Sequence, residues 1–441
     1  MGGGTMKQRY DSYKPSGIDW IGEIPSHWKL STLGKHFQVI LGKMLCPKPL
    51  DASYTLEEYY CAGDVHFDGV NNSNLKRMWF TPEEKNKYLV KDGDLLIVEG
   101  GAGAGGCALP YVDPSKNRYV QNSILIVRHK RNSTTYLKYL IEYLVKSGYV
   151  DIECNEATFA HFTKEKVCKI PFPVMPIAEQ EAIAAWLDEK CGEIDVAIAK
   201  VDREIELIDE LKQSEISRVV TRGLNPDASL RPSGIDWIGD VPEHWKVSKL
   251  KYLISEISSG GTPTSSNSEF YCDEGIPWVA IGDMSTSDYI NVTAKHITEA
   301  GKEDKNLKKY SAGTLLYSIY ATIGKVAELT IPACINQAIL ALVPSDSIIK
   351  LYLKYVLKGM ERYVISLTSS NTQANLSADK VNNYILPVPP LSEQKEIADY
   401  LDKKCAEIDG LKAKLVKKRE ALKELRQAII SEVVTGKRKV I

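Results

Sequence analysis

The chain has 441 residues, 44% of them hydrophobic, and a formal net charge of −1 at pH 7. This length predicts about two to four domains with ordinary hydrophobic cores. No apolar run approaches the roughly 18 residues of a membrane-spanning helix, and no secretory segment is present, so we expect a cytoplasmic location. The small net charge argues against a protein that coats nucleic acid in bulk, although local patches can still bind DNA.

Cysteine and histidine usage does not indicate a metal site. The nine cysteines include no Cys-x-x-Cys pair, and none of the seven histidines lies at ligand spacing from a cysteine pair. We therefore expect reduced, buried thiols and no metal. Residues 1–5, Met-Gly-Gly-Gly-Thr, are expected to be an appended segment ahead of a native start at Met6.

Two stretches of the sequence occur twice. Residues 15–29 return at 232–246, a shift of 217, and residues 177–222 return at 391–436, a shift of 214. Similar shifts at both ends of a unit indicate a duplicated module. The segments between the repeats, 30–169 and 247–384, share little sequence. We interpret this pattern as one scaffold, present twice, that holds two different recognition surfaces.

The segments between the repeats are predicted to be mixed α/β. Their charges are nearly balanced, with 19 Lys and Arg against 16 Asp and Glu in residues 29–169 and 14 against 13 in residues 246–384. Affinity for DNA would therefore have to be shared with other subunits. Apolar runs between Gly, Pro or Asn predict strands, and 3.6-residue periodicity predicts helices. The predicted strands are 95–98, 123–127, 314–317 and 338–342, the helices are 136–146 and 349–360, and a turn-rich linker is 223–229.

A glycine-rich run follows the first of these strands. Gly101, Gly103 and Gly106 match the spacing G-x-G-x-x-G, which occurs in dinucleotide-binding proteins. The run continues into Cys107 and a proline rather than into a helix, so no helix N-terminus would face a phosphate. A tightly bent loop is therefore favoured over a cofactor site. No other phosphate-binding or catalytic motif is present, and we expect the chain to catalyse nothing itself.

Polar residues beside glycines and aromatic residues are the remaining candidates for function. Gln, Asn, Lys, Arg and Thr contact base edges and phosphates in protein–DNA complexes, although such residues also form ordinary turns and caps. His27 and His244 are interpreted as packed structural groups. The predicted DNA-binding residues are Lys43, Lys76, Arg77, Gly101, Gly103, Gln121, Asn122, Thr158, His161 and Thr163 in the first half, and Ser259, Gly260, Gly261, Thr262, Tyr317, Tyr320, Lys325, Asn336, Gln337, Asn371, Thr372 and Gln373 in the second.

Residues 177–222 and 391–436 are predicted to be long helices, each preceded by a proline and followed by a glycine, Gly223 or Gly436. About 45 residues at about 1.5 Å each would extend about 70 Å. Apolar residues at alternating spacings of three and four predict a coiled coil, so we expect the helices to pack on each other rather than each on its own domain. The predicted seam is Leu187, Cys191, Ile194, Ile198, Val201, Ile205, Ile208, Leu401, Cys405, Ile408, Leu411, Leu415, Leu422 and Leu425.

Two motifs, each present twice, resemble those of a known family. Ser-Gly-Ile-Asp-Trp-Ile-Gly-Glu-Ile-Pro-Ser-His-Trp at 16–28 returns with three substitutions at 233–245. Pro-hydrophobic-x-Glu-Gln-x-x-Ile-Ala-x-x-Leu-Asp occurs at 176–188 and at 390–402. Together the four copies resemble the specificity subunit of type I restriction–modification systems, and the resemblance covers the chain from Tyr10 onward.

The resemblance implies an α+β fold with an internal pseudo-two-fold duplication. Two mixed α/β target recognition domains would be joined by two long helices that form an antiparallel coiled coil. The implied domains are an N-terminal conserved segment 1–28, recognition domain 1 at 29–170, a central conserved helix at 171–223, a repeated linker at 224–245, recognition domain 2 at 246–386 and a C-terminal conserved helix at 387–441.

The resemblance also implies partners. These are double-stranded DNA, with the two domains recognising a bipartite, asymmetric site, together with two methylation subunits and the restriction or motor subunits. S-adenosylmethionine, ATP and Mg would belong to the partner subunits, and this chain would hold no cofactor. The family's recognition domains have no transferable contact motif, so the DNA-binding residues above remain local inferences from this sequence.

Three alternatives remain open. The chain could be a coiled-coil assembly scaffold without direct contact to DNA, or the specificity portion of another restriction–methylation system. The third alternative is an enzyme that uses the glycine run, and binding of S-adenosylmethionine to the isolated chain would favour it.

Overall fold

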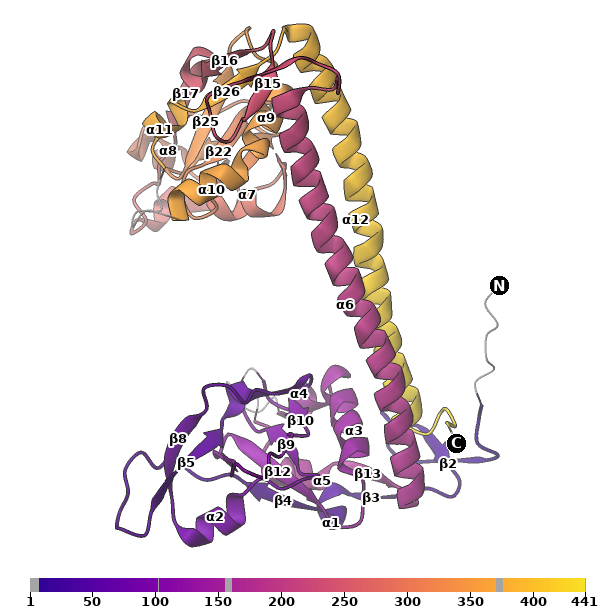
Figure 1. Ribbon diagram of the computed structural model, residues 1–441. Helices are drawn as coiled ribbons and strands as arrows, with labels where there is room; N and C mark the ends of the chain where they lie inside the picture. Colours follow the sequence, from indigo (N-terminus) through magenta and orange to yellow (C-terminus); the bar gives the residue numbers. More distant parts are fainter. Residues whose placement is uncertain (1–7, 102, 155–160, 370–375, 441) are drawn as a thin grey trace. The chain divides into compact units, whose positions relative to one another are not determined.

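The structure is a computed structural model that describes residues 8–101, 103–154, 161–369 and 376–440 (Figure 1). These residues form two compact units. Unit 1 comprises the described residues up to Asp202 and those from Lys417 onward, and unit 2 comprises Arg203–Val416. Two long helices, α6 (Ile177–Arg222) and α12 (Leu391–Val434), each contribute one part to unit 1 and the other part to unit 2.

Unit 1 is built around a four-stranded antiparallel sheet with the order β10-β9-β12-β4. A second sheet, β11-β5-β8, pairs β11 with β5 in parallel. The strands are β1 (Tyr13–Pro15), β2 (Glu23–Pro25), β3 (Lys29–Thr32), β4 (Phe37–Leu41), β5 (Thr55–Tyr60), β6 (Val65–His66), β7 (Gly69–Val70), β8 (Lys76–Phe80), β9 (Leu95–Val98), β10 (Cys107–Ala108), β11 (Tyr119–Val120), β12 (Ile124–His129) and β13 (Pro171–Val174). The shorter helices are α1 (Leu33–His36), η1 (Ala62–Asp64), α2 (Pro82–Tyr88), α3 (Thr134–Lys146), α4 (Tyr149–Cys154) and α5 (Lys164–Lys169).

Unit 2 has a main sheet with the order β17-β25-β22-β23-β20 and a second sheet with the order β18-β21-β19-β24. Its strands are β14 (Leu230–Pro232), β15 (Asp240–Pro242), β16 (Lys246–Lys249), β17 (Ile254–Ser259), β18 (Tyr271–Cys272), β19 (Ile276–Val279), β20 (Tyr289–Ile290), β21 (His296–Ile297), β22 (Leu315–Ser318), β23 (Val326–Leu329), β24 (Cys334–Ile335), β25 (Ile339–Pro344) and β26 (Ile385–Val388). Its shorter helices are η2 (Leu250–Tyr252), η3 (Ser268–Phe270), α7 (Ile281–Thr286), α8 (Glu299–Asp304), α9 (Lys350–Gly359), α10 (Glu361–Ser369) and α11 (Ala378–Asn382).

The two units share one topology although their middle segments differ in sequence. The strand order β4-β12-β9-β10 in unit 1 corresponds to β17-β25-β22-β23 in unit 2. In each second sheet one pair of strands is parallel, β11 with β5 and β24 with β19. The peripheral antiparallel pairs β3-β13 and β16-β26 also correspond. The predicted α+β fold and the duplication are therefore confirmed, and the predicted strands and helices lie within two residues of their observed bounds.

The central strands are buried on both faces. In β9, Leu95 and Ile97 belong to the core that α3 covers, whereas Leu96 and Val98 belong to the core beneath the second sheet. Strand β22 of unit 2 has the same alternation. Because neighbouring residues of a strand point to opposite faces, a run of four apolar residues fits a sheet that is covered on both sides.

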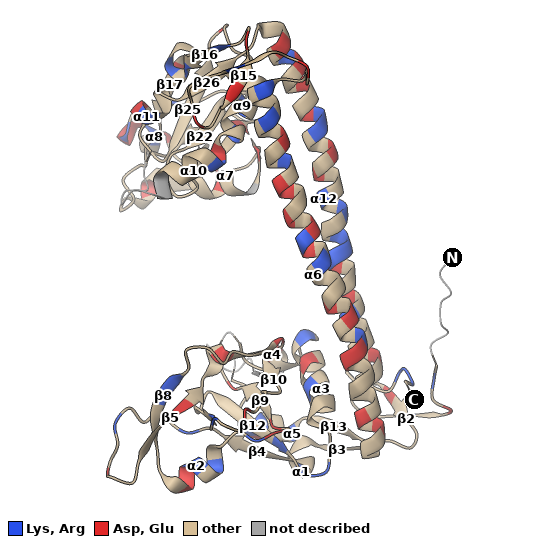
Figure 2. Ribbon diagram, viewed as in Figure 1, with Lys and Arg blue, Asp and Glu red and all other residues tan. Residues whose placement is uncertain are grey.

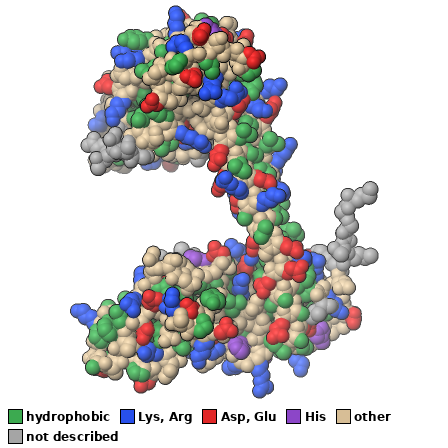
Figure 3. Space-filling model, viewed as in Figure 1, with side chains coloured by type: hydrophobic (Ala, Val, Ile, Leu, Met, Phe, Trp, Pro, Cys, Tyr) green, Lys and Arg blue, Asp and Glu red, His purple; other side chains and the backbone are tan. Residues whose placement is uncertain are grey.

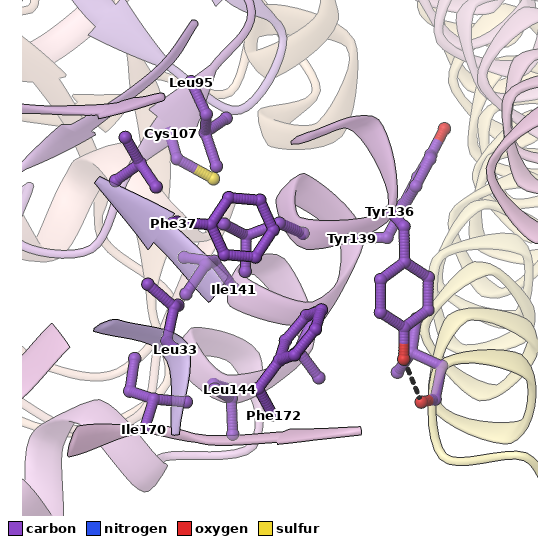
Figure 4. Packing of buried hydrophobic residues seen from close by; sticks show 14 of the residues in the cluster. Leu33, Phe37, Leu95, Cys107, Tyr136, Tyr139, Ile141, Leu144, Ile170 and Phe172 are labelled. Atoms are coloured by element: carbon purple, nitrogen blue, oxygen red, sulfur yellow. Dashed lines mark hydrogen bonds between the residues drawn. The ribbon is translucent and has the colours of Figure 1, made fainter. Parts of the chain in front are cut away.

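Tyrosines of α3 attach the sheet of unit 1 to both long helices. The Tyr136 hydroxyl donates a hydrogen bond to the backbone oxygen of Val434 in α12 at 2.9 Å, which is the dashed contact of Figure 4. The Tyr139 hydroxyl donates to Asp188 Oδ1 in α6 at 2.7 Å. Burial raises the pKa of both phenols, so both remain hydrogen-bond donors.

Unit 2 repeats this arrangement. The hydroxyl of Tyr352 in α9 donates to the backbone oxygen of Val220 at 3.4 Å, and that of Tyr355 donates to Asp402 Oδ1 at 3.2 Å. In each unit, therefore, one short helix joins the main sheet to parts of both α6 and α12.

The first turn of each long helix carries a Glu–Gln pair that we call the Glu–Gln anchor. In unit 1, the buried Glu179 carboxylate accepts hydrogen bonds from Tyr10 Oη and Trp28 Nε1, both at 2.9 Å, and lies 2.9 Å from His27 Nε2. Gln180, which is fully buried, accepts from the backbone N–H of the α3 N-cap residue at 3.0 Å. The anchor thus fixes the N-terminal segment and the start of α3 to the same turn of α6.

Unit 2 contains the equivalent anchor, Glu393 and Gln394. Glu393 accepts from Trp245 Nε1 at 2.8 Å and contacts His244 Nε2 at 2.6 Å. Gln394 Oε1 accepts from the backbone N–H of Ile349, the residue that precedes α9, at 2.8 Å. His27 and His244 therefore contact the anchor carboxylates, as structural groups would, but their side chains are 49% and 53% exposed, so the prediction that they are packed is wrong.

The long helices run antiparallel within each unit. In unit 1, Asp195 pairs with Arg426 at 3.0 Å and Asp202 with Arg419 at 3.2 Å, so a step of seven along α6 is matched by a step of seven backwards along α12. In unit 2, the pairs are Asp209 with Lys412 and Lys212 with Asp409, each at 2.7 Å. Figure 2 shows basic and acidic residues interspersed along both helices.

Most of the predicted seam is covered, but two positions are wrong. Leu411 and Leu425 are 53% and 48% exposed. Lys412 and Arg426, the next residue in each case, are half-buried instead, because their aliphatic stems cover apolar surface while their charged ends reach carboxylates of α6. Leu187, Cys191, Ile194, Val201, Leu401, Cys405 and Ile408 are buried, and Ile198, Ile205, Ile208, Leu415 and Leu422 are half-buried.

The predicted helix ends agree with the structure to within two residues. Gly223 and Gly436 follow the last turns with φ of 74° and 76°, the left-handed conformation that glycine adopts at low cost. Each packs against the tryptophan of the repeated segment, Trp245 or Trp28. The end of each long helix is thereby tied to the same segment that contacts a Glu–Gln anchor.

Replacing Glu179 with Ala should destabilise unit 1 selectively. The change leaves the buried Trp28 indole N–H and Tyr10 hydroxyl without their acceptor, which we expect to lower the free energy of unfolding by about 2–4 kcal/mol. Urea denaturation followed by circular dichroism measures the effect. Glu181→Ala, an exposed site in the same turn, is the matched control and should change stability by less than about 0.5 kcal/mol. Equal midpoints for the two variants would contradict the role of the anchor.

Candidate nucleic-acid interface

In unit 1, the loops that hold most of the predicted site residues meet at one end of the main sheet. Where β4 ends, the Gly42 N–H donates to the Ile124 oxygen at 3.0 Å and the Lys43 N–H donates to the Val120 oxygen at 3.0 Å. The Asn122 N–H returns a hydrogen bond to the Lys43 oxygen at 2.8 Å. A Cβ on Gly42 would lie 2.2 Å from the Gln121 oxygen, so only glycine permits this approach.

The glycine run is a bent connection between antiparallel strands beside the same turn. It joins β9 to β10, and Gly101 has a φ of 87°. The Glu99 N–H donates to the Ser123 oxygen at 2.9 Å, and the Phe162 N–H donates to the Glu99 oxygen at 2.6 Å. This places Gly101 and Gly103 near Gln121, Asn122 and His161. The favoured interpretation of the run as a tightly bent loop is confirmed.

Glu99 is a titratable group within this cluster. Burial raises the pKa of its carboxyl, Glu165 adds to the increase and His161 opposes it. A carboxylate or carboxyl at this position can accept a hydrogen bond from the amino group of cytosine. Sequence reasoning did not include Glu99 among the site residues, although it directly precedes the glycine run.

Unit 2 has the same construction after β17. The Gly260 N–H donates to the Ile339 oxygen at 3.3 Å, and the Gly261 N–H donates to the Ile335 oxygen at 3.0 Å. A Cβ on Gly260 would lie 1.8 Å from the Ile335 oxygen. Thr262 Oγ1 donates a hydrogen bond to Gln337 Oε1. The structure therefore brings residues 259–262 next to 336–337, as it brings 42–43 next to 121–122 in unit 1.

The connection between β22 and β23 occupies the position that the glycine run has in unit 1. The Ser318 N–H donates to the Lys325 oxygen at 2.9 Å, and the Leu376 N–H donates to the Ile319 oxygen at 3.2 Å. Tyr320 is 54% exposed at the tip, and Ala321 has a φ of 59°, which is unusual for a residue other than glycine. Lys325 is exposed and pairs with Glu361 at 2.8 Å.

Some predicted site residues have other roles in the structure. Tyr317 is fully buried and its hydroxyl lies 3.4 Å from that of Tyr384, so its prediction as a DNA contact is wrong. The sequence placed it at the edge of a loop, but the strand continues through Ser318 and turns Tyr317 into the core. Lys43 is buried and its ammonium group pairs with Glu84. Thr163 caps α5.

The other predictions are exposed or lie outside the described residues. Lys76 and Arg77 are exposed on β8, in the second sheet rather than in the loop cluster, although β11 of that sheet leads directly into Gln121. Figure 3 shows basic and hydrophobic side chains exposed side by side over this region of unit 1. Thr158, Asn371, Thr372 and Gln373 lie outside the described residues.

The described residues include neither a metal-ligand cluster nor a membrane-spanning helix. No group of three or more His, Cys, Asp or Glu side chains in the described part of the chain is placed to hold a metal ion. Among the helices of the same part, none has the length and apolar character needed to cross a membrane.

The chain is similar in sequence to known proteins. A family model described as type I restriction modification DNA specificity domain matches residues 242–417. The specificity subunit of the type I restriction enzyme MjaVIII from Methanocaldococcus jannaschii is 24% identical over 435 residues, 95% of this chain and 94% of that protein. The putative MjaX specificity subunit of the same organism is 24% identical over 434 residues, 95% of this chain and 96% of that protein. Over nearly its whole length the chain is thus similar to type I specificity subunits.

The fold of this chain also occurs in a solved structure. A chain in a structure described as the basis of complex assembly and conformational transition of the type I R-M system superposes with a TM-score of 0.71 and 19% sequence identity. The match covers 93% of this chain and 98% of the other. The family resemblance predicted from the four motif copies is thus confirmed.

Alanine at Gly42 or Gly260 should disturb the loop clusters specifically. Each added Cβ meets a backbone oxygen that cannot rotate away, so we expect a loss of about 1–3 kcal/mol in stability from overpacking. We also expect faster amide hydrogen exchange at residues 120–124 for Gly42→Ala and 335–339 for Gly260→Ala. Gly63→Ala and Gly282→Ala, whose added Cβ would meet nothing within 4 Å, are the controls. Unchanged exchange in both test variants would contradict the close approach.

Proposed function

We propose that the chain is the DNA-recognition component of a type I restriction–modification complex. Each unit would recognise one half of a bipartite, asymmetric DNA site through its loop cluster. The observation that carries the proposal is that two loop clusters stand at equivalent positions of one duplicated frame but present different side chains. A few base-edge contacts, each contributing about 1–3 kcal/mol, provide discrimination between sequences.

We further propose that the chain assembles the complex and catalyses no reaction itself. Two methylation subunits would bind along the duplicated frame and supply S-adenosylmethionine chemistry, and restriction or motor subunits would supply the reactions that require ATP and Mg. The nearly balanced charges of the two recognition segments support shared DNA binding, because phosphate contacts made by partner subunits would add to a weak intrinsic affinity.

The alternatives make different predictions. A coiled-coil scaffold without DNA contact would give no salt-dependent shift of cognate DNA that depends on this chain. A chain that acts enzymatically through its glycine run would bind S-adenosylmethionine alone in isothermal titration. The bent strand connection observed there supports the recognition role over the enzymatic one.

Exchanging one recognition segment should change one half of the DNA site only. Residues 30–169 would be replaced by the corresponding segment of a relative with a different target, and methylated bases would be mapped in cells that contain the chimera. We expect one half of the methylated sequence to change and the other half to persist. The reciprocal exchange of residues 247–384 is the control and should change the other half. A change in both halves from either exchange would contradict independent recognition.

Lengthening both helices together should change the number of unspecified base pairs between the half-sites. Four residues would be inserted after Glu206 in α6 and four after Leu415 in α12, so that the Asp202–Arg419 and Asp209–Lys412 pairs on either side keep their register. Four residues add about 6 Å of helix, which corresponds to about one or two base pairs. Mapping of methylated bases gives the new spacing. An unchanged spacing with active methylation would contradict the idea that the helices set the gap.

A further inference from the structure

An exposed apolar tip lies next to the loop cluster of unit 1. The segment between β4 and β5 contains Met44, Leu45 and Leu50, whose side chains are 75%, 55% and 83% exposed. We call these three residues the apolar tip. The segment begins at Lys43, which is hydrogen-bonded to Asn122 in the loop cluster. Grouped, strongly exposed apolar side chains are costly in water and commonly mark a binding surface.

The apolar tip is held in place by defined contacts. The Trp79 N–H of β8 donates to the Cys46 oxygen at 3.0 Å, and Cys46 Sγ contacts the Lys48 oxygen at 3.2 Å. Pro47 and Pro49 restrict the backbone on both sides of Lys48. Such a loop loses little conformational entropy when it binds.

The charges around the apolar tip fit a polyanion. Within the described part of the chain, Lys48, Lys76 and Arg77 form no ion pair, whereas the acidic side chains nearby are neutralised: Glu57 by Lys85, Glu58 by Arg118 and Glu84 by Lys43. The Asp51 carboxylate accepts hydrogen bonds from the backbone and side chain of Ser53. These hydrogen bonds leave Asp51 negatively charged, so one unpaired carboxylate stands beside Leu50. The three cations without ion pairs outnumber it, and a surface that combines apolar side chains with a local excess of positive charge suits DNA better than an uncharged protein surface.

The corresponding segment of unit 2 is different in character. Residues 260–270 follow β17 and contain Thr262, which bonds to Gln337, and Thr264, which bonds to Asp304. No large hydrophobic side chain of this segment is exposed. The two units thus differ in the chemistry of one equivalent loop.

We propose that the apolar tip inserts at a base step within the half-site recognised by unit 1 and partly unstacks it. Side chains such as Leu and Met act as wedges between base pairs in other DNA-binding proteins, where the kink brings more protein surface against the duplex. Lys48, Lys76 and Arg77 contact the flanking phosphates. Unit 1 therefore recognises its half-site partly through the deformability of one base step, and unit 2 through polar contacts. This inference rests on the proposed function.

The test uses the chain assembled with its methylation subunits and a duplex that carries its mapped site. 2-Aminopurine replaces one base at a time across the half-site of unit 1, and its fluorescence reports unstacking. We expect a several-fold increase at one step with the wild-type complex. In the triple variant Met44→Ser, Leu45→Ser, Leu50→Ser, we expect this signal to fall to background and DNA affinity to drop at least tenfold.

The control is Val292→Ser, an exposed apolar site in unit 2 (70% exposed), which should leave both readouts unchanged. Leu50→Met, which retains an apolar side chain, should keep the signal and thereby separates insertion from misfolding. The methylation subunits flip the base that they methylate, so only an unstacked base at another position reports the wedge. Site-specific methylation with no unstacked base other than the methylated one would overturn the wedge and leave the proposed function intact. Loss of methylation-subunit binding in the triple variant would show a protein-binding surface instead and would also overturn it. If the wild-type complex methylates no specific site, the proposed function itself fails.

Discussion

A carboxylate in the first turn of each long helix, buried at Glu179 and half-buried at Glu393, connects the long helix to the segments packed around it. Glu179 accepts hydrogen bonds from side chains of the N-terminal segment, and the adjacent Gln180 accepts one from the backbone that begins α3. A carboxylate without such donors would be costly to bury, so the contacts specify one geometry rather than add much net stability. The recognition sheet, the repeated Trp segment and the long helix are thereby held in a defined arrangement within unit 1, and Glu393 and Gln394 do the same in unit 2.

The sheets explain how one frame can hold two different surfaces. Strands such as β9 and β22 are buried on both faces and are therefore restricted to apolar residues of suitable volume. The loops at one end of each sheet are free of that restriction except where backbones touch, at Gly42 and Gly260. Side chains in these loops can vary at little cost to the core. Under the proposed function, this separation of stability from recognition explains why the duplicated sequence has divergent middle segments.

Most helices and strands were predictable because the signals that determine them are local in the sequence. The helix bounds follow from periodicity and terminal glycines, and the strands follow from short apolar runs between turn residues. The common topology of the two middle segments was not predicted, although Tyr136-Leu-Lys-Tyr139 returns as Tyr352-Leu-Lys-Tyr355 and both copies contact the long helices. A four-residue repeat is easily missed without knowledge of the contacts that it makes.

The site was less predictable because exposure and pairing depend on tertiary structure. Composition cannot show that Lys43 is neutralised by Glu84 or that Tyr317 points into the core. The spacing of apolar residues also cannot show that Lys412 and Arg426 lie toward the partner helix in place of Leu411 and Leu425. The reason is that a long basic side chain covers apolar surface almost as well as leucine does. The predicted DNA-binding residues formed polar clusters in equivalent loops of both units. They did not include the exposed apolar residues Met44, Leu45 and Leu50.

Internal ion pairing also explains why net charge is a poor guide to DNA binding in this chain. Some charges of the long helices are paired between α6 and α12, as in Asp195–Arg426 and Lys212–Asp409, and several charges of the second sheet in unit 1 are paired within that unit. A phosphate would be attracted by the exposed cations that have no ion-pair partner among the described residues, such as Lys76 and Arg77 on the second sheet of unit 1. A formal charge of −1 therefore conceals a local positive surface. Because that surface is small, salt would readily screen its attraction for phosphates. Under the proposed function, selectivity would therefore come from contacts that salt weakens little, namely hydrogen bonds to base edges and apolar contacts within the duplex.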